Sequence, residues 1–342
     1  MRQVVASLVA PVPMCEVRRI HGADANRGFF ALLVARSPWR PHAVRVGEGF
    51  RYPRRDGPHI RYLSEQEVAD AYRNRFSEAR IQLDRLDIVL NEGIDRLEMT
   101  DTIWLCTAIV PMLEGRMEIT LREMKEVRGW ALQYQSRILG GGAWAAERPE
   151  PGVGIRRLTL ESAPDRETGK QRSAYAELHR DGAGFMALPV WRGWGKDESP
   201  RIRDQRLVEG AADMLGFLVH HQARSGAAGD ALVAMAIIGT RPVELVHDRH
   251  MGLVQRVSGS RPLAETITSR HSIASEAIRT DPQELASAVR VVLADLLQGF
   301  GVPECLHITP QGELRRPMFR FAQPINWDTW APGFLLSEEN PG

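Results

Sequence analysis

The sequence predicts an α+β fold with a small mixed sheet that contains a hairpin, a long connecting helix and a second α+β domain. Three observations predict it. Short apolar runs separated by proline, glycine and Asp-Gly turns occupy residues 28–62, as in strands joined by tight turns. An apolar stripe at helical spacing follows from residue 64 to residue 97. Beyond residue 102, strand-like and helix-like segments interleave with hairpin signals, which favours α+β over a parallel sheet.

Length and composition set the broad class. A chain of 342 residues usually forms two domains, and 43% hydrophobic with 25% charged residues is ordinary for a globular protein. The formal net charge of +1 gives no overall attraction to nucleic acid. No run reaches the roughly 18 apolar residues of a membrane span, so no membrane partner is expected. Cys15, Cys106 and Cys305 have no zinc or disulfide spacing, which indicates no metal, no other cofactor and a cytoplasmic location.

The first 34 residues are predicted to form short strands. Residues 3–20 are rich in valine and alanine and are interrupted by Pro11 and Pro13, which suggests two strands rather than a signal peptide. The apolar run 29–34 is long enough for a buried strand and too short for a typical helix. Pro38 and Pro41 end that run, because proline fixes φ and keeps the preceding residue extended.

Residues 43–62 are predicted to form strands around two turns, Gly47-Glu48-Gly49 and Asp56-Gly57. This region is strongly basic. Between residues 36 and 62, seven arginines face only two acids, a net charge of +5, whereas residues 64–101 carry five arginines and ten acids, a net of −5. The basic charge is therefore confined to the predicted loop and strands.

Residues 28–76 resemble the second half of the Schlafen AlbA-2 domain, a nucleic-acid-binding module common in bacteria. The resemblance is carried by the strand 29–34, by Pro41-His42, by Tyr52-Pro53-Arg54-Arg55-x-Gly57, and by Leu63-Ser64-Glu65 opening a helix through Tyr72-Arg73-Asn74-Arg75-Phe76. It covers about the first fifth to quarter of the chain. The Glu-x-Lys strand and the Gly-Gly strand that normally begin the family do not precede Met1, which suggests a truncated or degenerate first domain at residues 1–76.

The basic stretch predicts a surface for DNA or RNA. Arginine binds phosphate bidentately, and Trp39, Phe50 and Tyr52 can stack on bases. We expect the arginines of the hairpin to line one groove, namely Arg51, Arg54, Arg55 and Arg61. The full set of candidate binding residues is Arg36, Arg40, His42, Arg45, Arg51, Tyr52, Arg54, Arg55 and Arg61. The alternative is a solvated edge strand whose charges prevent aggregation.

One long helix is predicted from Ser64, where Ser64 and Glu67 form a capping box. Residues 77–101 of this helix are predicted to connect the first domain to the second. The apolar positions of its stripe are Val68, Tyr72, Phe76, Ala79, Leu83, Leu86, Leu90, Ile94 and Leu97. The stripe can pack on the second domain of the same chain. Between residues 76 and 90 the spacing also fits a coiled coil, so the helix 64–97 is a candidate for a homo-oligomer seam.

The second domain, residues 102–330, has no assigned role. Strands are expected at 103–113, 155–161 and 231–238, with 243–246 as a partner of the last. A hairpin is expected from 173–178 and 185–190, and helices at 119–134, at 203–222 and after the N-cap Asp281 with Pro282 at N1. Residues 139–154, which include Gly140 to Gly142, are predicted to be a flexible linker, and the tail 331–342 is predicted to end in disorder.

Other polar clusters are predicted to be structural. His179-Arg180-Asp181 resembles a kinase triplet without the rest of that set and is expected to be a turn. His247-Asp248-Arg249-His250 is expected to be a polar loop, and His220-His221 a favourable charge at a helix C-terminus. Catalytic residues are not identified. Two other functions stay open: a metal-dependent endoribonuclease of Schlafen type with its acids outside residues 28–76, and a protein that dimerises through the long helix.

Overall fold

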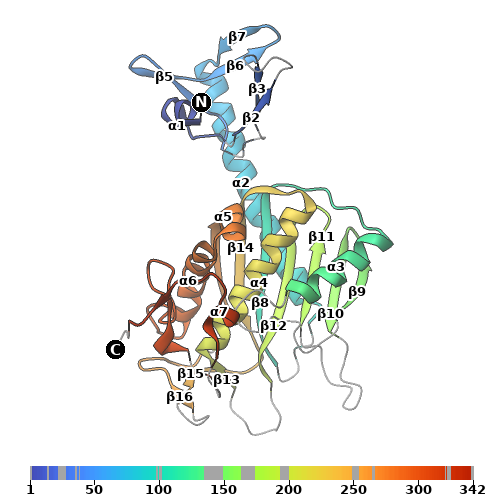
Figure 1. Ribbon diagram of the computed structural model, residues 1–342, viewed down its shortest axis with the longest axis vertical. Coiled ribbons are helices and arrows are strands. Elements are labelled where there is room, and N and C mark those ends of the chain that lie inside the picture. The colour runs from blue at the N-terminus through green and yellow to red at the C-terminus, as the bar shows by residue number, and fades with distance from the viewer. Residues whose placement is uncertain are drawn as a thin grey trace. The chain divides into compact units, whose positions relative to one another are not determined.

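The computed structural model describes residues 2–13, 15–21, 28–34, 37, 39–97, 99, 102–134, 149–162, 174–192, 200–248, 254–263, 266–319, 321 and 325–339. The chain divides into two compact units, Met1–Asp84 and Arg85–Gly342, and the division lies within the long helix α2 (Glu65–Ile94) (Figure 1). Helices and strands are both abundant, and the strands form several small sheets and one large sheet. The predicted α+β class is therefore confirmed.

The first unit begins with helix α1 (Arg2–Leu8), where a strand was expected. The expectation was wrong because residues 2–8 contain good helix formers and no breaker, and the prolines that interrupt the run come only at Pro11 and Pro13. The following strands are short: β1 (Val9–Ala10), β2 (Cys15–His21), β3 (Gly28–Val34), β4 (Ala43–Val46), β5 (Gly49–Arg51), β6 (Pro53–Asp56) and β7 (His59–Tyr62).

These strands form three small antiparallel sheets, ordered β1-β4-β5, β2-β3 and β6-β7. Both predicted turns are present, and Gly47 and Gly57 adopt the positive φ angles of 62° and 58° that the turns require. The expected burial of β3 is wrong: Phe29 and Phe30 are 75% and 62% exposed. In the described part of the chain β3 pairs only with β2, so its apolar residues stay open to solvent.

Helix α2 begins as predicted and ends at Ile94. The Ser64 backbone N–H donates to Glu67 Oε2 at 2.9 Å, and the Glu67 backbone N–H donates to Ser64 Oγ at 3.4 Å, which confirms the capping box. Only the end of the apolar stripe is covered. The buried residues of this helix are Leu86, Val89, Leu90 and Gly93, whereas Phe76 and Leu83 are 68% and 42% exposed.

The second unit is built on a seven-stranded sheet in which every neighbouring pair is antiparallel. The strand order is β17 (Ile267–Ile273), β14 (Ala228–Ile238), β8 (Thr102–Leu113), β12 (Gly184–Arg192), β11 (Tyr175–His179), β10 (Arg157–Ser162) and β9 (Pro149–Gly154). The predicted strands at 103–113, 155–161 and 231–238 and the predicted hairpin are confirmed. Residues 149–154, expected to be linker, form the edge strand β9, and Gly140 to Gly142 lie outside the described residues.

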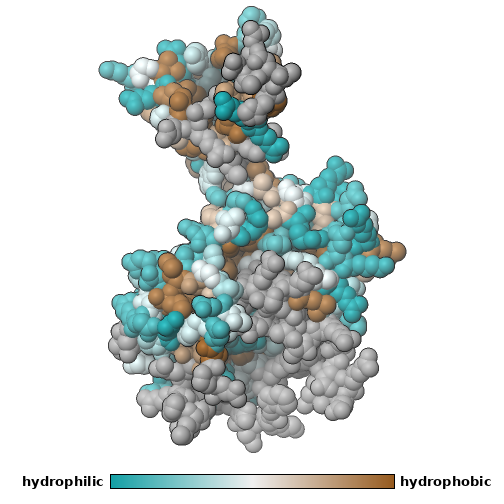
Figure 2. All heavy atoms as spheres, in the orientation of Figure 1, coloured by the Kyte–Doolittle hydropathy of each residue, from teal (hydrophilic) through white to brown (hydrophobic). Residues whose placement is uncertain are grey.

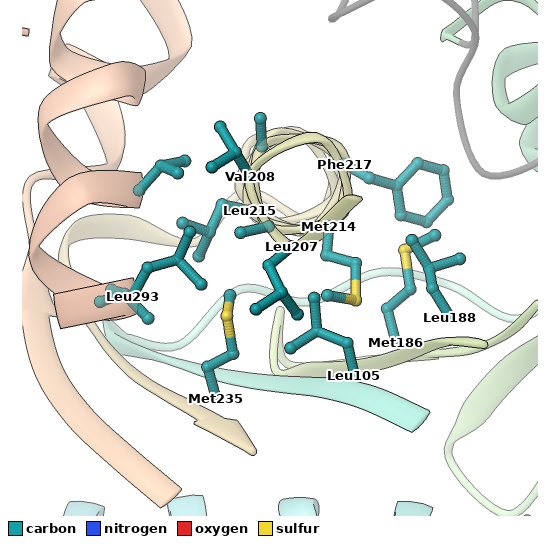
Figure 3. Packing of buried hydrophobic residues seen from close by; sticks show 14 of the residues in the cluster. Leu105, Met186, Leu188, Leu207, Val208, Met214, Leu215, Phe217, Met235 and Leu293 are labelled. Carbon is teal, nitrogen blue, oxygen red and sulfur yellow. The ribbon is translucent and has the colours of Figure 1, made fainter. Parts of the chain in front are cut away.

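Both faces of the sheet are covered, which explains why β8 reads as a continuous apolar run. Leu105 and Ile109 of β8 belong to the core formed with helices α3 (Leu121–Tyr134), α4 (Asp204–Ser225) and α6 (Pro282–Gly299). Trp104 and Cys106 alternate with them and pack with the end of α2 on the opposite face. Figure 3 shows the first of these cores, where α4 lies over the sheet. The labelled side chains of α4 meet Leu105, Met186, Leu188, Met235 and Leu293.

Smaller elements complete this unit: α5 (Ser275–Thr280), the 3-10 helix η2 (Arg316–Met318) and α7 (Trp327–Trp330). Strand β15 (Glu244–Asp248) lies between β13 (Arg201–Arg203) and β16 (Val254–Arg256), so the expectation that 243–246 pairs with β14 is wrong. Strand β19 (Leu336–Ser337) pairs with β18 (Leu314–Arg315), and Glu338 and Glu339 form ion pairs with Arg316 and Arg315. The tail is therefore structured to residue 339.

The three predicted helices of the second unit are confirmed as α3, α4 and α6. The Asp281 side chain accepts a hydrogen bond from the Gln283 backbone N–H at 2.9 Å, so it caps α6 as expected, with Pro282 as the first helical residue. None of the helices in the described part of the chain is long and apolar enough to cross a membrane.

Candidate nucleic-acid interface

Strand register separates the arginines of the β6–β7 hairpin. Arg54 lies opposite Arg61, and Arg55 lies opposite Ile60. Residues directly opposite each other share a face of the ladder, whereas successive residues of a strand point to opposite faces. Arg54 and Arg55 therefore do not line one groove together, contrary to the expectation from the sequence.

Arg61 is bound within the first unit. Its guanidinium donates to both carboxylate oxygens of Glu67, at 2.8 and 2.7 Å, and so links β7 to the first turn of α2. These hydrogen bonds, with that from Ser64, lower the pKa of Glu67 to about 2. Arg40 is likewise hydrogen-bonded to Glu78 of α2. Both guanidinium groups already have a carboxylate partner.

Other arginines of the hairpins have no such partner. In the described residues, Arg45 and Arg54 form no ion pair, and Arg55 donates only to the Gly57 carbonyl oxygen, at 3.0 Å. The Arg51 guanidinium lies 5.1 Å from the centre of the Tyr62 ring, in a cation–π contact that leaves its N–H groups without a carboxylate. All four are exposed. Arg36, the remaining predicted arginine, lies outside the described residues.

His42 and Tyr52 hold the strand region together. His42 Nδ1 donates to the Pro11 carbonyl oxygen at 2.6 Å, and its Nε2 is buried without a hydrogen-bond partner. The Tyr52 and Tyr72 hydroxyls lie 3.1 Å apart, with the rings edge to face at 6.2 Å. The hydrogen bond with Tyr72, followed by partial burial, raises the pKa of Tyr52.

A groove of about 550 Å³ lies between these strands and α2. Its strand side is lined by Arg40, Pro41, His42, Val44, Tyr52, Pro53, Arg54 and Leu63, and its helix side by Glu67, Asp70, Ala71 and Asn74. Four predicted residues therefore line it: Arg40, His42, Tyr52 and Arg54. Arg45, Arg51, Arg55 and Arg61 are not among its lining residues.

The helix side of this groove was missed in the sequence. Glu67, Asp70, Ala71 and Asn74 are separated by three, one and three residues, which places them on one face of α2. That spacing is the signal in the sequence that could have identified this side of the groove. The hairpins also carry exposed aromatic rings, with Phe50 61% and Tyr62 47% exposed. Figure 2 shows hydrophilic and hydrophobic residues interspersed on the surface of this unit.

The second unit contains a buried charge cluster around Glu177, whose side chain is fully inaccessible. Tyr175 donates to it at 2.6 Å, His179 lies at 3.1 Å, and Arg96 and Arg157 each lie at 3.2 Å. Burial by itself raises the pKa of Glu177, but the hydrogen bonds from His179 and Tyr175 and the two positive charges outweigh it and hold the pKa below its usual value. Both oxygens of this carboxylate have partners within the protein, so its role is structural.

A second cluster surrounds Asp204, the first residue of α4. His247 Nδ1 is hydrogen-bonded to Asp204, and His307 Nε2 lies 3.8 Å from the same oxygen. Burial raises the pKa of the neighbouring Cys305 to about 11, so its thiol is not a ready nucleophile. The adjoining cavity, of about 10 Å³, is no larger than one water. Within the described ranges, no three His, Cys, Asp or Glu side chains are placed to hold a metal ion.

Two histidine expectations are wrong. His247 lies in strand β15 rather than in a loop, and His250 lies outside the described residues. His221 is buried, which lowers its pKa to about 4 and keeps it neutral; its Nε2 is 3.1 and 3.2 Å from the carbonyl oxygens of His179 and Ala183. It therefore supplies a hydrogen bond rather than a charge at the helix terminus. His179-Arg180-Asp181 enters a hairpin turn, as predicted.

Comparison with known proteins identifies no relative: no family model, curated protein or solved structure matches the chain. The resemblance to the Schlafen AlbA-2 domain therefore stays a hypothesis based on residues 28–76. The case for a function depends on the geometry of the first unit.

Proposed function

We propose that the first unit binds nucleic acid, DNA or RNA, through the arginines of its two hairpins. One observation carries this proposal. Arg45, Arg51, Arg54 and Arg55 are exposed and form no ion pair with a carboxylate in the described part of the chain, whereas Arg40 and Arg61 are paired. A guanidinium without a partner can form bidentate hydrogen bonds with a phosphate and loses no existing ion pair in doing so.

The surroundings of these arginines support the same ligand. Phe50 lies opposite Arg45 in the β4–β5 ladder, and Tyr62 lies beneath the Arg51 guanidinium. Exposed aromatic rings beside positive charge are typical of surfaces on which bases stack while the backbone is neutralised. The resemblance of residues 28–76 to the Schlafen AlbA-2 domain agrees with this proposal, and we place the protein in the cytoplasm as part of it.

Salt dependence of binding tests the proposal. If three or four of these arginines each neutralise one phosphate, the logarithm of the affinity should fall with the logarithm of the salt concentration with a slope of about −2 to −3 for a single strand and about −3 to −4 for a duplex. The measurement is fluorescence anisotropy with short labelled DNA and RNA, single- and double-stranded. The absence of binding at low salt, in a chain whose circular dichroism shows that it is folded, would remove the proposal.

A second candidate function is self-association through α2. Phe76 and Leu83 on its predicted seam are exposed, although apolar stripes on helices are normally covered. In that case light scattering should give the mass of a dimer, and Leu83→Asp should reduce it to that of a monomer. A monomer at high concentration of the unmodified protein would exclude this function.

A further inference from the structure

Most polar groups that line the groove of the first unit are already used. Arg61 holds both oxygens of Glu67, Arg40 is bonded to Glu78, and the Tyr52 hydroxyl is bonded to that of Tyr72. The groups that remain free are therefore few, and they limit the chemistry of any ligand.

Free groups are present on both sides of the groove. On the strand side, Arg54 has no partner in the described residues, and the buried His42 Nε2 is also unpaired. On the helix side, Asp70 accepts hydrogen bonds from Gln66 and Arg73 through Oδ1, and Oδ2 has no hydrogen bond within the described part of the chain. Asn74 lies one turn further along the same face, and its amide forms no hydrogen bond with any of the residues that the structure describes. The groove is thus lined by a guanidinium on its strand side and by a carboxylate oxygen and an amide on its helix side.

We propose that this groove binds one unpaired guanine base of a single-stranded nucleic acid. This inference depends on the proposed function. Guanine has two adjacent acceptors, O6 and N7, that fit an arginine fork, and two adjacent donors, N1–H and the N2 amino group, that fit a carboxylate oxygen. Adenine and uracil lack the pair of adjacent donors, and cytosine lacks the adjacent O6 and N7 acceptors.

A preference for single-stranded nucleic acid follows from the same hydrogen bonds. In a duplex the N1–H and N2 amino donors of guanine are engaged with cytosine and cannot reach Asp70. Recognition of Watson–Crick edges in this way is typical of proteins that bind unpaired bases. We therefore expect a single strand to bind with a guanine preference that its duplex lacks.

The groove is large enough to admit a base and has apolar walls. Its volume of about 550 Å³ lies within the range of about 300–1,000 Å³ usual for small-molecule sites. Apolar groups that can contact the faces of a base come from Pro41, Val44, Pro53, Leu63 and Ala71. His42 also lines the groove, and the hydrogen bond from its Nδ1 to the Pro11 carbonyl oxygen fixes the orientation of its ring.

A base-replacement series tests the inference directly. Labelled pyrimidine 12-mers with one central guanine, adenine, cytosine or inosine are compared by fluorescence anisotropy at one low salt concentration, as DNA and as RNA. Guanine should bind at least about 5-fold more tightly than adenine, as expected for one bidentate base contact. Inosine, which lacks the N2 amino group, should lie between them.

Variants assign the preference to the groove. Asp70→Asn should reduce the guanine-over-adenine ratio towards 1 without changing the salt slope, because Asp70 is not a phosphate contact. Glu65→Gln on the same helix, outside the groove, is the matched control and should keep the ratio. Equal affinities for guanine and adenine strands overturn this inference and leave the proposed function intact. A ratio that survives in folded Asp70→Asn also overturns it, and no binding of any strand overturns both.

Discussion

In the first unit Arg45 and Arg54 are exposed and form no ion pair among the residues that the structure describes, whereas in the second unit Glu177 is fully buried among Tyr175, His179 and two arginines. The difference shows two uses of charge. A buried carboxylate must have its hydrogen bonds satisfied by the protein, so it contributes to folding and is closed to ligands. An exposed guanidinium contributes little to folding, so it stays available for a phosphate.

Helix α2 shows the same contrast along its own length. Its residues after Asp84 include the buried Leu86 and Leu90, whereas Phe76 and Leu83 earlier in the helix are exposed. Substitutions of buried groups in the second unit should therefore change the stability of the fold most, and substitutions of the exposed arginines in the first unit should change binding. The predictions below test that separation.

The largest effect is expected at Glu177. Replacing it by Ala leaves Arg96 and Arg157 without their buried partner, and breaking such an arrangement costs about 3–5 kcal/mol of unfolding free energy. Urea unfolding followed by circular dichroism measures this. Glu150→Ala, an exposed position on edge strand β9, is the control and should change stability by less than about 0.5 kcal/mol. Equal effects of the two substitutions would contradict the structural role of Glu177.

A smaller loss is expected for Gly93→Ala. A Cβ atom at this position would lie 2.3 Å from Cγ of Phe185, so the helix and the sheet would have to separate. Overpacking of this kind costs about 1–3 kcal/mol. Gly129→Ala in α3, where a Cβ meets nothing within 4 Å, should instead stabilise the protein by about 0.5–1 kcal/mol, because alanine favours a helix over glycine. Opposite signs in thermal unfolding are the expected result.

In the first unit, Ser64→Ala should cost about 1 kcal/mol of local helix stability, since it removes the hydroxyl that accepts from the Glu67 backbone N–H. Hydrogen exchange of the amides at the start of α2 is the measurement. Ser77→Ala, in the interior of the same helix, is the control. If the exchange rates at residues 65–68 do not change, the capping box does not stabilise the helix.

The smallest expected effect concerns pH. Glu67 has a pKa lowered from 4.5 to about 2 by Arg61, so the contribution of this pair is complete above pH 4.5 and is lost as the pH falls towards 2. An NMR titration of the Glu67 carboxyl should therefore shift to higher pH in Arg61→Gln and stay unchanged in Arg73→Gln. A titration midpoint that is the same in both variants would contradict the pairing.

Local signals in the sequence predicted much of the fold. Gly47 and Gly57 marked turns because few other residues take a positive φ, and Ser64 with Glu67 marked a helix start through backbone hydrogen bonds. What failed depended on contacts between distant residues. The burial of Phe29, the neutrality of His221 and the sheet to which β15 belongs are set by the tertiary structure, which a local pattern does not contain.

The candidate site was predictable to a similar degree. The sequence showed that residues 36–61 are basic, and it correctly predicted Arg54 as a residue of the candidate site. The strand alternation that places Arg54 and Arg55 on opposite faces was also visible in the sequence. The pairing of Arg40 with Glu78 joins residues far apart in the sequence, so composition could not show that this arginine is occupied. The number of arginines in this stretch is therefore larger than the number that lack a carboxylate partner in the structure.

The salt slope of single variants is the most direct test of the central claim that unpaired arginines bind nucleic acid. Arg55→Gln and Arg45→Gln should each flatten the slope by about 0.7–0.9, one phosphate contact apiece. Arg61→Gln, which removes an arginine already held by Glu67, should leave the slope unchanged. Equal flattening by Arg61→Gln and Arg55→Gln, or no flattening by Arg55→Gln and Arg45→Gln, would contradict the account.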